Sequence, residues 1–177
     1  FLADSYIAIA VREAIVLEFA PTIVSLILAG KVGSNIASTL GTMRVTEQMD
    51  ALRVMGINPA SYLVLPKIAA CLLFNPILVI FGMLLGMVGG YLAGDLLNLV
   101  NIEVYLSGYF MEFFPHYVTY SLTKTFVFAF IIATVSAFFG YRVEGGAVEV
   151  GKASTKSVVA MSFTIILFNY ILTDILL

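Results

Sequence analysis

Residues Ile68–Gly94 read IAACLLFNPILVIFGMLLGMVGGYLAG, a stretch without a charged side chain between Lys67 and Asp95. A helix of about 20 apolar residues crosses the hydrocarbon core of a bilayer, which is about 30 Å thick. Backbone that faces lipid must satisfy its own hydrogen bonds, so only helices and closed barrels span membranes. This stretch is long enough and apolar enough to predict a membrane-spanning helix.

Three other segments have a similar length and character. They are Ala14–Met43, which contains Glu18 and Lys31; Tyr117–Tyr141, which contains Lys124; and Ser157–Thr173, which residues 175–177 extend. No strand-like alternation of charge competes with these runs. We therefore predict an all-α protein, a polytopic membrane helix bundle with four transmembrane helices, forming one domain over residues 1–177.

The composition excludes a soluble globular domain. Of 177 residues, 61% are hydrophobic and 11% are charged, whereas soluble domains have about 45–50% apolar and about 25% charged residues. The net charge of −2 does not favour nucleic acid as a partner. The single Cys71 has no second cysteine for a disulfide or a Cys-based metal site, and we expect no bound metal.

Basic residues in the loops predict the orientation. Arg44, Arg53 and Lys67 lie between the first two spans, and Arg142, Lys152 and Lys156 lie between the last two. The connection from Asp95 to His116 contains acidic residues and no Lys or Arg. Because cytoplasmic loops carry the excess of Lys and Arg, this connection faces away from the cytoplasm, and both ends of the chain lie on the outer side.

The first cytoplasmic loop contains a helical pattern at Arg44–Met55 (RVTEQMDALRVM). Its apolar residues at three- and four-residue spacing are Val45, Met49, Leu52 and Met55. This spacing places them on one face of a helix, and Gly56 follows as a helix stop. We predict a short amphipathic helix at the cytoplasmic surface.

Charged residues within the predicted spans need a polar environment, because a charge that faces lipid costs about 2.5–3.5 kcal/mol. Lys31 can extend toward the cytoplasmic surface, and Lys124 is expected to face the protein interior or a hydrated cavity. Glu18 lies in the outer part of its span, and no basic residue except Arg12 is in obvious reach. A hydrated pocket, a preceding helix or a lipid headgroup could surround it. We then expect Glu18→Leu to be at least as stable as the wild type.

Small residues form two stripes that let helices approach closely. One contains Gly82, Gly86, Gly90 and Gly94, and the other contains Gly30, Gly33, Ser34, Ala37, Ser38 and Gly41. Packing within the chain is favoured over a dedicated dimer surface.

The sequence offers little for enzyme chemistry. Gly146–Ala153 nearly matches the GxxxxGK[ST] phosphate loop, but Ala153 replaces the Ser or Thr that would bind magnesium. The single histidine, His116, belongs to no catalytic motif and lies among aromatic residues at a membrane interface. We predict that the chain is not an enzyme.

Two stretches carry a resemblance to a known family. Glu18–Pro21 (EFAP) with residues 29–67 (AGKVGSNIASTLGTMRVTEQMDALRVMGINPASYLVLPK), and residues 140–159 (GYRVEGGAVEVGKASTKSVV), resemble the permeases of MCE-type lipid ABC transporters, the Mla permeases. The resemblance covers essentially the whole chain. Family members usually carry an interfacial helix and one more membrane helix ahead of this part, so an N-terminally truncated chain is expected.

The resemblance implies a homodimeric permease in the bacterial inner membrane, with a cytoplasmic ABC ATPase below it and MCE-domain subunits on the periplasmic side. Such a complex moves phospholipid between the inner and outer membranes. ATP and magnesium would bind to the ATPase, and no cofactor would bind to this chain.

The resemblance also implies site residues. The family's coupling helix, which docks into the ATPase, matches Arg44, Glu47, Gln48, Asp50, Leu52 and Met55. The outward-facing lipid pocket matches Leu17, Glu18, Phe19, Pro21, Asn169 and Tyr170. Two positions depart from the family. Leu17 stands where some members carry Arg, and Asn169 stands where some carry Asp opposite the lysine that matches Lys124.

Two other functions are alternatives to a permease. A self-sufficient secondary transporter or channel would need intramembrane charges for ion coupling and often has an internal repeat, which this sequence does not show convincingly. An intramembrane enzyme is disfavoured, because the sequence lacks the catalytic motifs that such an enzyme would need. Co-purification with an ATPase would separate the permease from the first alternative.

Overall fold

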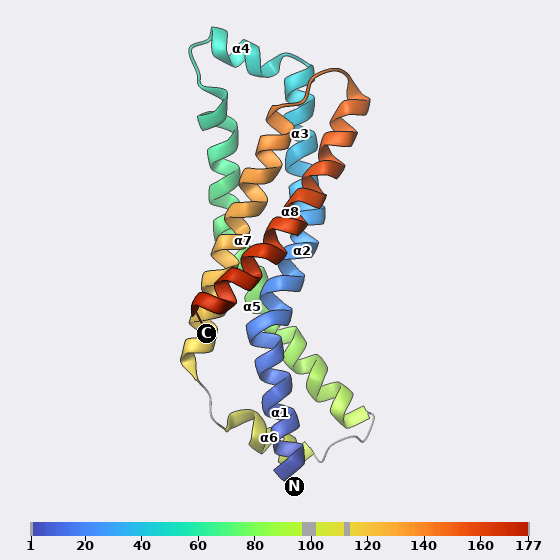
Figure 1. The fold of residues 1–177 in the computed structure, drawn as a ribbon, viewed down its shortest axis with the longest axis vertical. Helices are drawn as coiled ribbons and strands as arrows, with labels where there is room; N and C mark the ends of the chain where they lie inside the picture. Colours follow the sequence, from blue (N-terminus) through green and yellow to red (C-terminus); the bar gives the residue numbers. More distant parts are fainter. Residues whose placement is uncertain (1, 97–101, 112–113, 177) are drawn as a thin grey trace.

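The computed structural model describes residues 2–96, 102–111 and 114–176. Within these ranges the regular elements are all helices, arranged as an elongated bundle (Figure 1). The described helices include four spans that are long and apolar enough to cross a membrane: Tyr6–Val45, Ala60–Leu96, Pro115–Tyr141 and Ala147–Leu176. The predicted all-α membrane bundle is confirmed, and each span extends beyond the apolar run that predicted it.

The first span is a continuous rod that alternates between α-helix and the wider π-helix. Its segments are α1 (Leu2–Ala14), η1 (Ile15–Ile23), α2 (Val24–Leu28), η2 (Ala29–Gly33) and α3 (Ser34–Val45), of which η1 and η2 are π-helical. Pro21 lies inside η1 and has no amide hydrogen to donate, and a local π adjustment lets a helix continue past such a residue. Single π turns are frequent at functional sites, and η1 carries Glu18.

The remaining elements complete the bundle. They are α4 (Gln48–Val54), η3 (Ala60–Val64) continuing into α5 (Leu65–Leu96), α6 (Ile102–Phe110), α7 (Pro115–Tyr141) and α8 (Ala147–Leu176). In Figure 1, α4 and the turn between α7 and α8 lie at one end, while α6 and the N-terminus lie at the other. The predicted orientation requires the two basic loops to lie at one end and the acidic connection to lie at the other. We call the end with α4 the cytoplasmic end and the end with α6 the outer end, following the loop charges.

Helix α7 lies at the centre of the bundle and contacts α3, α5, α8 and η1. Half of its most apolar stretch is buried, against 11% for that of α8. Buried side chains such as Phe128 and Ile132 pack against Met161 and Ile165 of α8. Most side chains on the outer faces of α5 and α8 are therefore left to face lipid or a partner.

Close helix contacts explain much of the two small-residue stripes. A Cβ on Gly82 would lie 3.0 Å from Val24, and one on Gly86 would lie 3.1 Å from Ile15. In the other stripe, Gly33 faces the Met161 side chain. The prediction of packing within the chain is confirmed at these positions, whereas Gly30 and Gly94 have nothing within 4 Å.

Candidate functional site

A cluster of polar side chains surrounds Glu18 in the outer half of the bundle. We call Glu18, Thr22, Tyr120, Lys124, Asn169 and Thr173 the Glu18 cluster. Lys124 Nζ donates to Glu18 Oε1 at 2.6 Å, and Asn169 Nδ2 donates to Glu18 Oε2 at 3.0 Å. Thr173 Oγ1 lies 3.3 Å from Oε1. The cluster therefore joins η1 to α7 and α8 through one carboxylate.

The two charges of the cluster differ in exposure. The Lys124 side chain is fully buried, whereas 41% of the Glu18 side chain is exposed. Lys124 Nζ also lies 4.6 Å from the centre of the Tyr120 ring, an arrangement that favours a cation. Since a buried ammonium without a partner is very costly, Glu18 is what allows Lys124 to lie inside the bundle.

The expectation that Glu18 has no basic partner in obvious reach is wrong. The stability expected of Glu18→Leu rested on that premise, and the substitution would instead leave the buried Lys124 without its carboxylate. The partner lies 106 residues away in sequence. A signal did exist: Glu18 and Lys124 have opposite charge, and both lie in the outer part of spans that enter from the same side. Hydropathy gives their depth but not the rotation of the helices, so the sequence did not reveal that they face each other.

The six residues predicted for the lipid pocket fall into two groups. Glu18 and Asn169 belong to the Glu18 cluster, and Pro21 is buried in the same π-helical segment as Glu18. Leu17 is half-buried, while Phe19 and Tyr170 are 56% and 75% exposed. An exposed apolar surface therefore lies next to a polar one. Sequence reasoning missed the hydroxyl groups of the cluster: Thr22, Tyr120 and Thr173.

The other intramembrane lysine lies apart. Lys31 is in η2, exposed on the surface of the first span. Its exposure agrees with a side chain that extends toward the cytoplasmic surface.

The cytoplasmic helix is shorter than predicted. It covers Gln48–Val54 instead of Arg44–Met55, because Arg44 and Val45 end α3, and Glu47 has a left-handed φ of 58°. This turn changes the direction of the chain, so the apolar residues of 44–55 do not share the single helix face that was predicted for them. Met49 is fully buried, whereas Met55 is 65% exposed.

An ion pair and a hydrogen bond link α4 to the rest of the bundle. Asp50 accepts from Arg44 at 3.0 Å and from Arg53 at 2.9 Å. Arg53 also donates to the Tyr141 hydroxyl at 2.8 Å, which links α4 to the end of α7. Exposed pairs of this kind each contribute less than about 1 kcal/mol, but together they fix the orientation of α4. Glu47 and Gln48 are exposed beside them.

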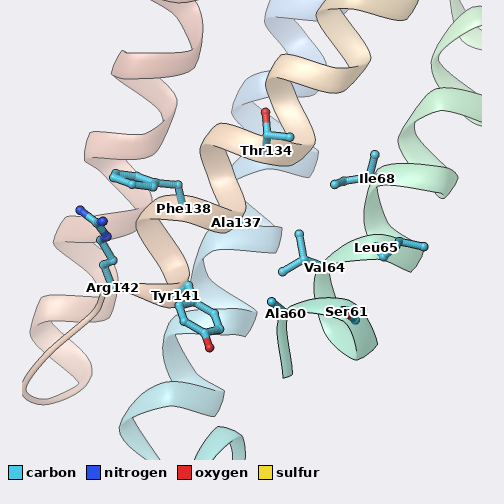
Figure 2. Close-up of a pocket in the computed structure, with 10 residues that line it drawn as sticks. All are labelled: Ala60, Ser61, Val64, Leu65, Ile68, Thr134, Ala137, Phe138, Tyr141 and Arg142. Carbon is cyan, nitrogen blue, oxygen red and sulfur yellow. The ribbon is translucent and has the colours of Figure 1, made fainter. Parts of the chain in front are cut away.

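A groove lies next to these contacts. It has a volume of about 490 Å³ and separates η3 and the start of α5 from the end of α7 (Figure 2). Val64, Ile68 and Ala137 line it, and Tyr141 lies at its edge. In Figure 2, Phe138 and Arg142 lie on the side of α7 away from Leu65 and Ile68.

The near-match to a phosphate loop is not a loop. Residues 147–153 form the first turns of α8, so their backbone amides are not arranged as a phosphate-binding loop. Among the residues that the structure describes, no group of three or more His, Cys, Asp or Glu could hold a metal ion.

Comparison with known proteins places the chain in a family. Residues 1–175 match the family model Permease MlaE. A probable ABC transporter permease protein of Rickettsia bellii is 41% identical over 175 residues, which are 99% of this chain and 68% of that protein. One of Synechocystis is 36% identical over 156 residues, 88% of this chain and 59% of that protein. The chloroplastic protein TRIGALACTOSYLDIACYLGLYCEROL 1 of Arabidopsis thaliana is 33% identical over 157 residues, 89% of this chain and 45% of that protein. The chain, a multi-pass transporter permease, thus belongs to the MlaE permease family.

Proposed function

We propose that this chain is the permease subunit of an ABC transporter that moves phospholipid between the inner and outer membranes of a bacterium. It works as a homodimer, with a cytoplasmic ATPase that binds ATP and magnesium and with MCE-domain subunits on the outer side. The chain itself makes and breaks no covalent bond. One observation carries the proposal: a half-exposed carboxylate, held by a buried lysine, lies beside exposed apolar side chains in the outer half of the bundle.

A phospholipid fits such a surface because it has a polar headgroup and apolar chains. Phe19 and Tyr170 offer apolar surface to acyl chains, and the exposed part of the Glu18 side chain is accessible to a headgroup or its water. Leu17 makes this surface more apolar than in members with Arg at that position. We therefore infer that acyl chains dominate binding. The Arabidopsis relative carries a glycolipid in its name, which supports a lipid as the class of substrate.

The ATPase would act through α4. Val54 is 90% exposed and Met55 is 65% exposed at the cytoplasmic end, which supplies an apolar contact, and Glu47 and Gln48 supply polar ones. A movement of α4 would reach α3 through Arg44 and α7 through Tyr141. The part of the first span from η1 to α3 then connects this movement to Glu18. Nucleotide would shift the population between two states of the dimer.

Photocrosslinking of the intact complex tests the proposal. A photoreactive residue at position 19 should capture lipid, and its yield should change when ATP is hydrolysed. Position 84 on α5 is a matched control, because Leu84 is 54% exposed and Phe19 is 56% exposed, and both lie in the outer half. Its yield should not depend on ATP.

Two results would contradict the proposal. One is equal ATP dependence, or none, at positions 19 and 84 together with normal lipid transport by Glu18→Ala. The other is transport by the purified chain without an ATPase, which would favour a self-sufficient transporter. Native mass spectrometry of the same sample would show whether two copies and the partner chains are present.

A further inference from the structure

A hollow with basic walls lies at the cytoplasmic end of α7 and α8. It has a volume of about 340 Å³. Its charged lining residues are Arg142, Glu144, Glu149, Lys152 and Lys156. The three cations exceed the two acids, so an anion is favoured over a cation as the ligand. We call this space the basic hollow.

The charges of the basic hollow are not all compensated. Lys152 Nζ lies 2.7 Å from Glu149 Oε1, so this pair is neutral. Within the described ranges, neither Arg142 nor Lys156 forms a salt bridge of 4.0 Å or less. The Arg142 guanidinium lies 4.3 Å from the centre of the Phe138 ring. Stacking holds the planar group in place and leaves its edge free to donate to a phosphate.

An apolar groove adjoins the basic hollow on the side that lies deeper in the membrane. It has a volume of about 540 Å³ and is lined by Val159, Ala160 and Phe163 of α8. Phe139 and Lys156 line both spaces. Phe163 lies seven residues beyond Lys156 on α8, about 10 Å along the helix axis. A polar site at the membrane surface therefore leads directly to an apolar site below it.

We propose that the basic hollow and the apolar groove together bind one anionic phospholipid of the cytoplasmic leaflet. Its phosphate contacts Arg142 and Lys156, and one acyl chain lies along Val159 and Phe163. The basic residues lie at the membrane surface and the apolar groove lies deeper, in the same order as the headgroup and the acyl chains of a phospholipid. A soluble anion would have no use for the apolar groove. The site lies at the opposite end of the bundle from Glu18. It requires only that the four spans cross the membrane, so it does not depend on the lipid that is transported.

Fluorescence quenching by brominated lipids tests this site in the full chain reconstituted in vesicles. The chain contains no Trp, so Phe163→Trp introduces a single reporter. Leu73→Trp is the matched control: Leu73 and Phe163 are both 68% exposed, and Leu73 lies six residues beyond Lys67 on α5. Each reporter is measured in brominated phosphatidylglycerol and in brominated phosphatidylcholine.

We expect phosphatidylglycerol to bind next to position 163 about fivefold more strongly than phosphatidylcholine. The basic hollow has a net excess of one cation, and the attraction of one basic residue for an anionic lipid corresponds to about this factor. The preference at position 73 should be smaller. Combining Phe163→Trp with Arg142→Gln and Lys156→Gln should reduce the preference to that of the control, whereas Lys67→Gln should leave it unchanged.

Two outcomes would overturn the proposal. Equal preference at positions 163 and 73 would mean that the cations only mark the cytoplasmic surface. Absence of quenching at position 163 by either lipid would mean that protein, such as a second copy of the chain, covers the groove. Because transport is not measured, neither outcome bears on the function proposed for the Glu18 cluster.

Discussion

The ammonium group of Lys124 lies 2.6 Å from the carboxylate of Glu18, and the two side chains differ sharply in exposure, 0% against 41%. Glu18 also accepts from Asn169, and Thr173 lies within hydrogen-bonding distance. The carboxylate therefore has other partners and access to the surface, whereas the lysine is enclosed. Loss of one partner should then have a different effect from loss of the other.

Glu18→Leu should lower the free energy of unfolding by about 2 kcal/mol, below the 3–5 kcal/mol typical of breaking a buried pair, because Glu18 is partly exposed. Lys124→Met should cost less, since Glu18 keeps Asn169 and can be hydrated. Glu18→Leu combined with Lys124→Met should recover most of the loss, because no charge is left buried. Thermal unfolding of the purified variants in detergent would measure all three. If both single variants lost the same free energy of unfolding and the double variant recovered none of it, the difference in burial between Lys124 and Glu18 would not matter for stability.

The exposed end of α4 should be required for binding the ATPase. Val54→Asp is expected to lower the amount of ATPase that co-purifies while the permease stays folded, since Val54 is 90% exposed. Val148→Asp is a matched control, because Val148 is 71% exposed in the first turn of α8. The turn between α7 and α8 lies at the same end of the bundle as α4 (Figure 1). Normal ATPase recovery with Val54→Asp would show that α4 only rests on lipid headgroups.

Glu47 forms the left-handed turn before α4 and also carries an exposed carboxylate. The effects of the turn and of the carboxylate can be measured separately. Its φ of 58° is disfavoured for a residue with a side chain by about 1–2 kcal/mol. Glu47→Gly should therefore stabilise the turn modestly, while loss of the carboxylate should weaken ATPase association. Unfolding and co-purification measured on the same sample would show opposite changes. A loss of stability would mean that the carboxylate holds the turn.

The contact between α3 and α7 should tolerate no side chain at Gly140. A Cβ there would lie 2.6 Å from the Ala37 carbonyl oxygen, a backbone atom that cannot move aside easily. Gly140→Ala should cost about 1–3 kcal/mol, the usual range for overpacking. Gly151→Ala, where nothing lies within 4 Å, should be neutral or more stable by about 0.5–1 kcal/mol. Unfolding temperatures that fall equally in both variants would contradict this account.

The outer helix α6 should depend on Arg12. This buried side chain donates from Nη1 to the carbonyl oxygens of Tyr109 at 2.6 Å and Met111 at 2.8 Å, at the C-terminal end of α6. A cation at this end of a helix satisfies free carbonyl groups and complements the helix dipole. Arg12→Gln should speed hydrogen exchange of the α6 amides. Glu13→Gln is the control, because Glu13 lies 3.9 Å from Arg12 and is partly exposed. Unchanged exchange in Arg12→Gln would contradict the role.

The sequence by itself determined the features that depend on local composition. Length and apolar character set the four spans, because a segment must match the thickness of the bilayer wherever it sits in the bundle. The loop cations predict the orientation for a similar reason, since each loop responds to the membrane surface on its own. The spacing of Gly82 and Gly86 predicts packing positions, because small residues at every fourth position form one stripe on a helix.

Only the tertiary structure decided how the helices are rotated against one another. Hydropathy places Glu18 and Lys124 at similar depth, but their contact depends on the π-helical turns of η1 and on the packing of α7. The start of α4 was also decided by the tertiary structure. The pattern 44–55 is periodic, yet the left-handed turn at Glu47 makes the helix begin at Gln48, with Met49 buried and Met55 exposed. A periodic sequence defines the faces of a helix, whereas the surface that each face meets is a property of the whole bundle.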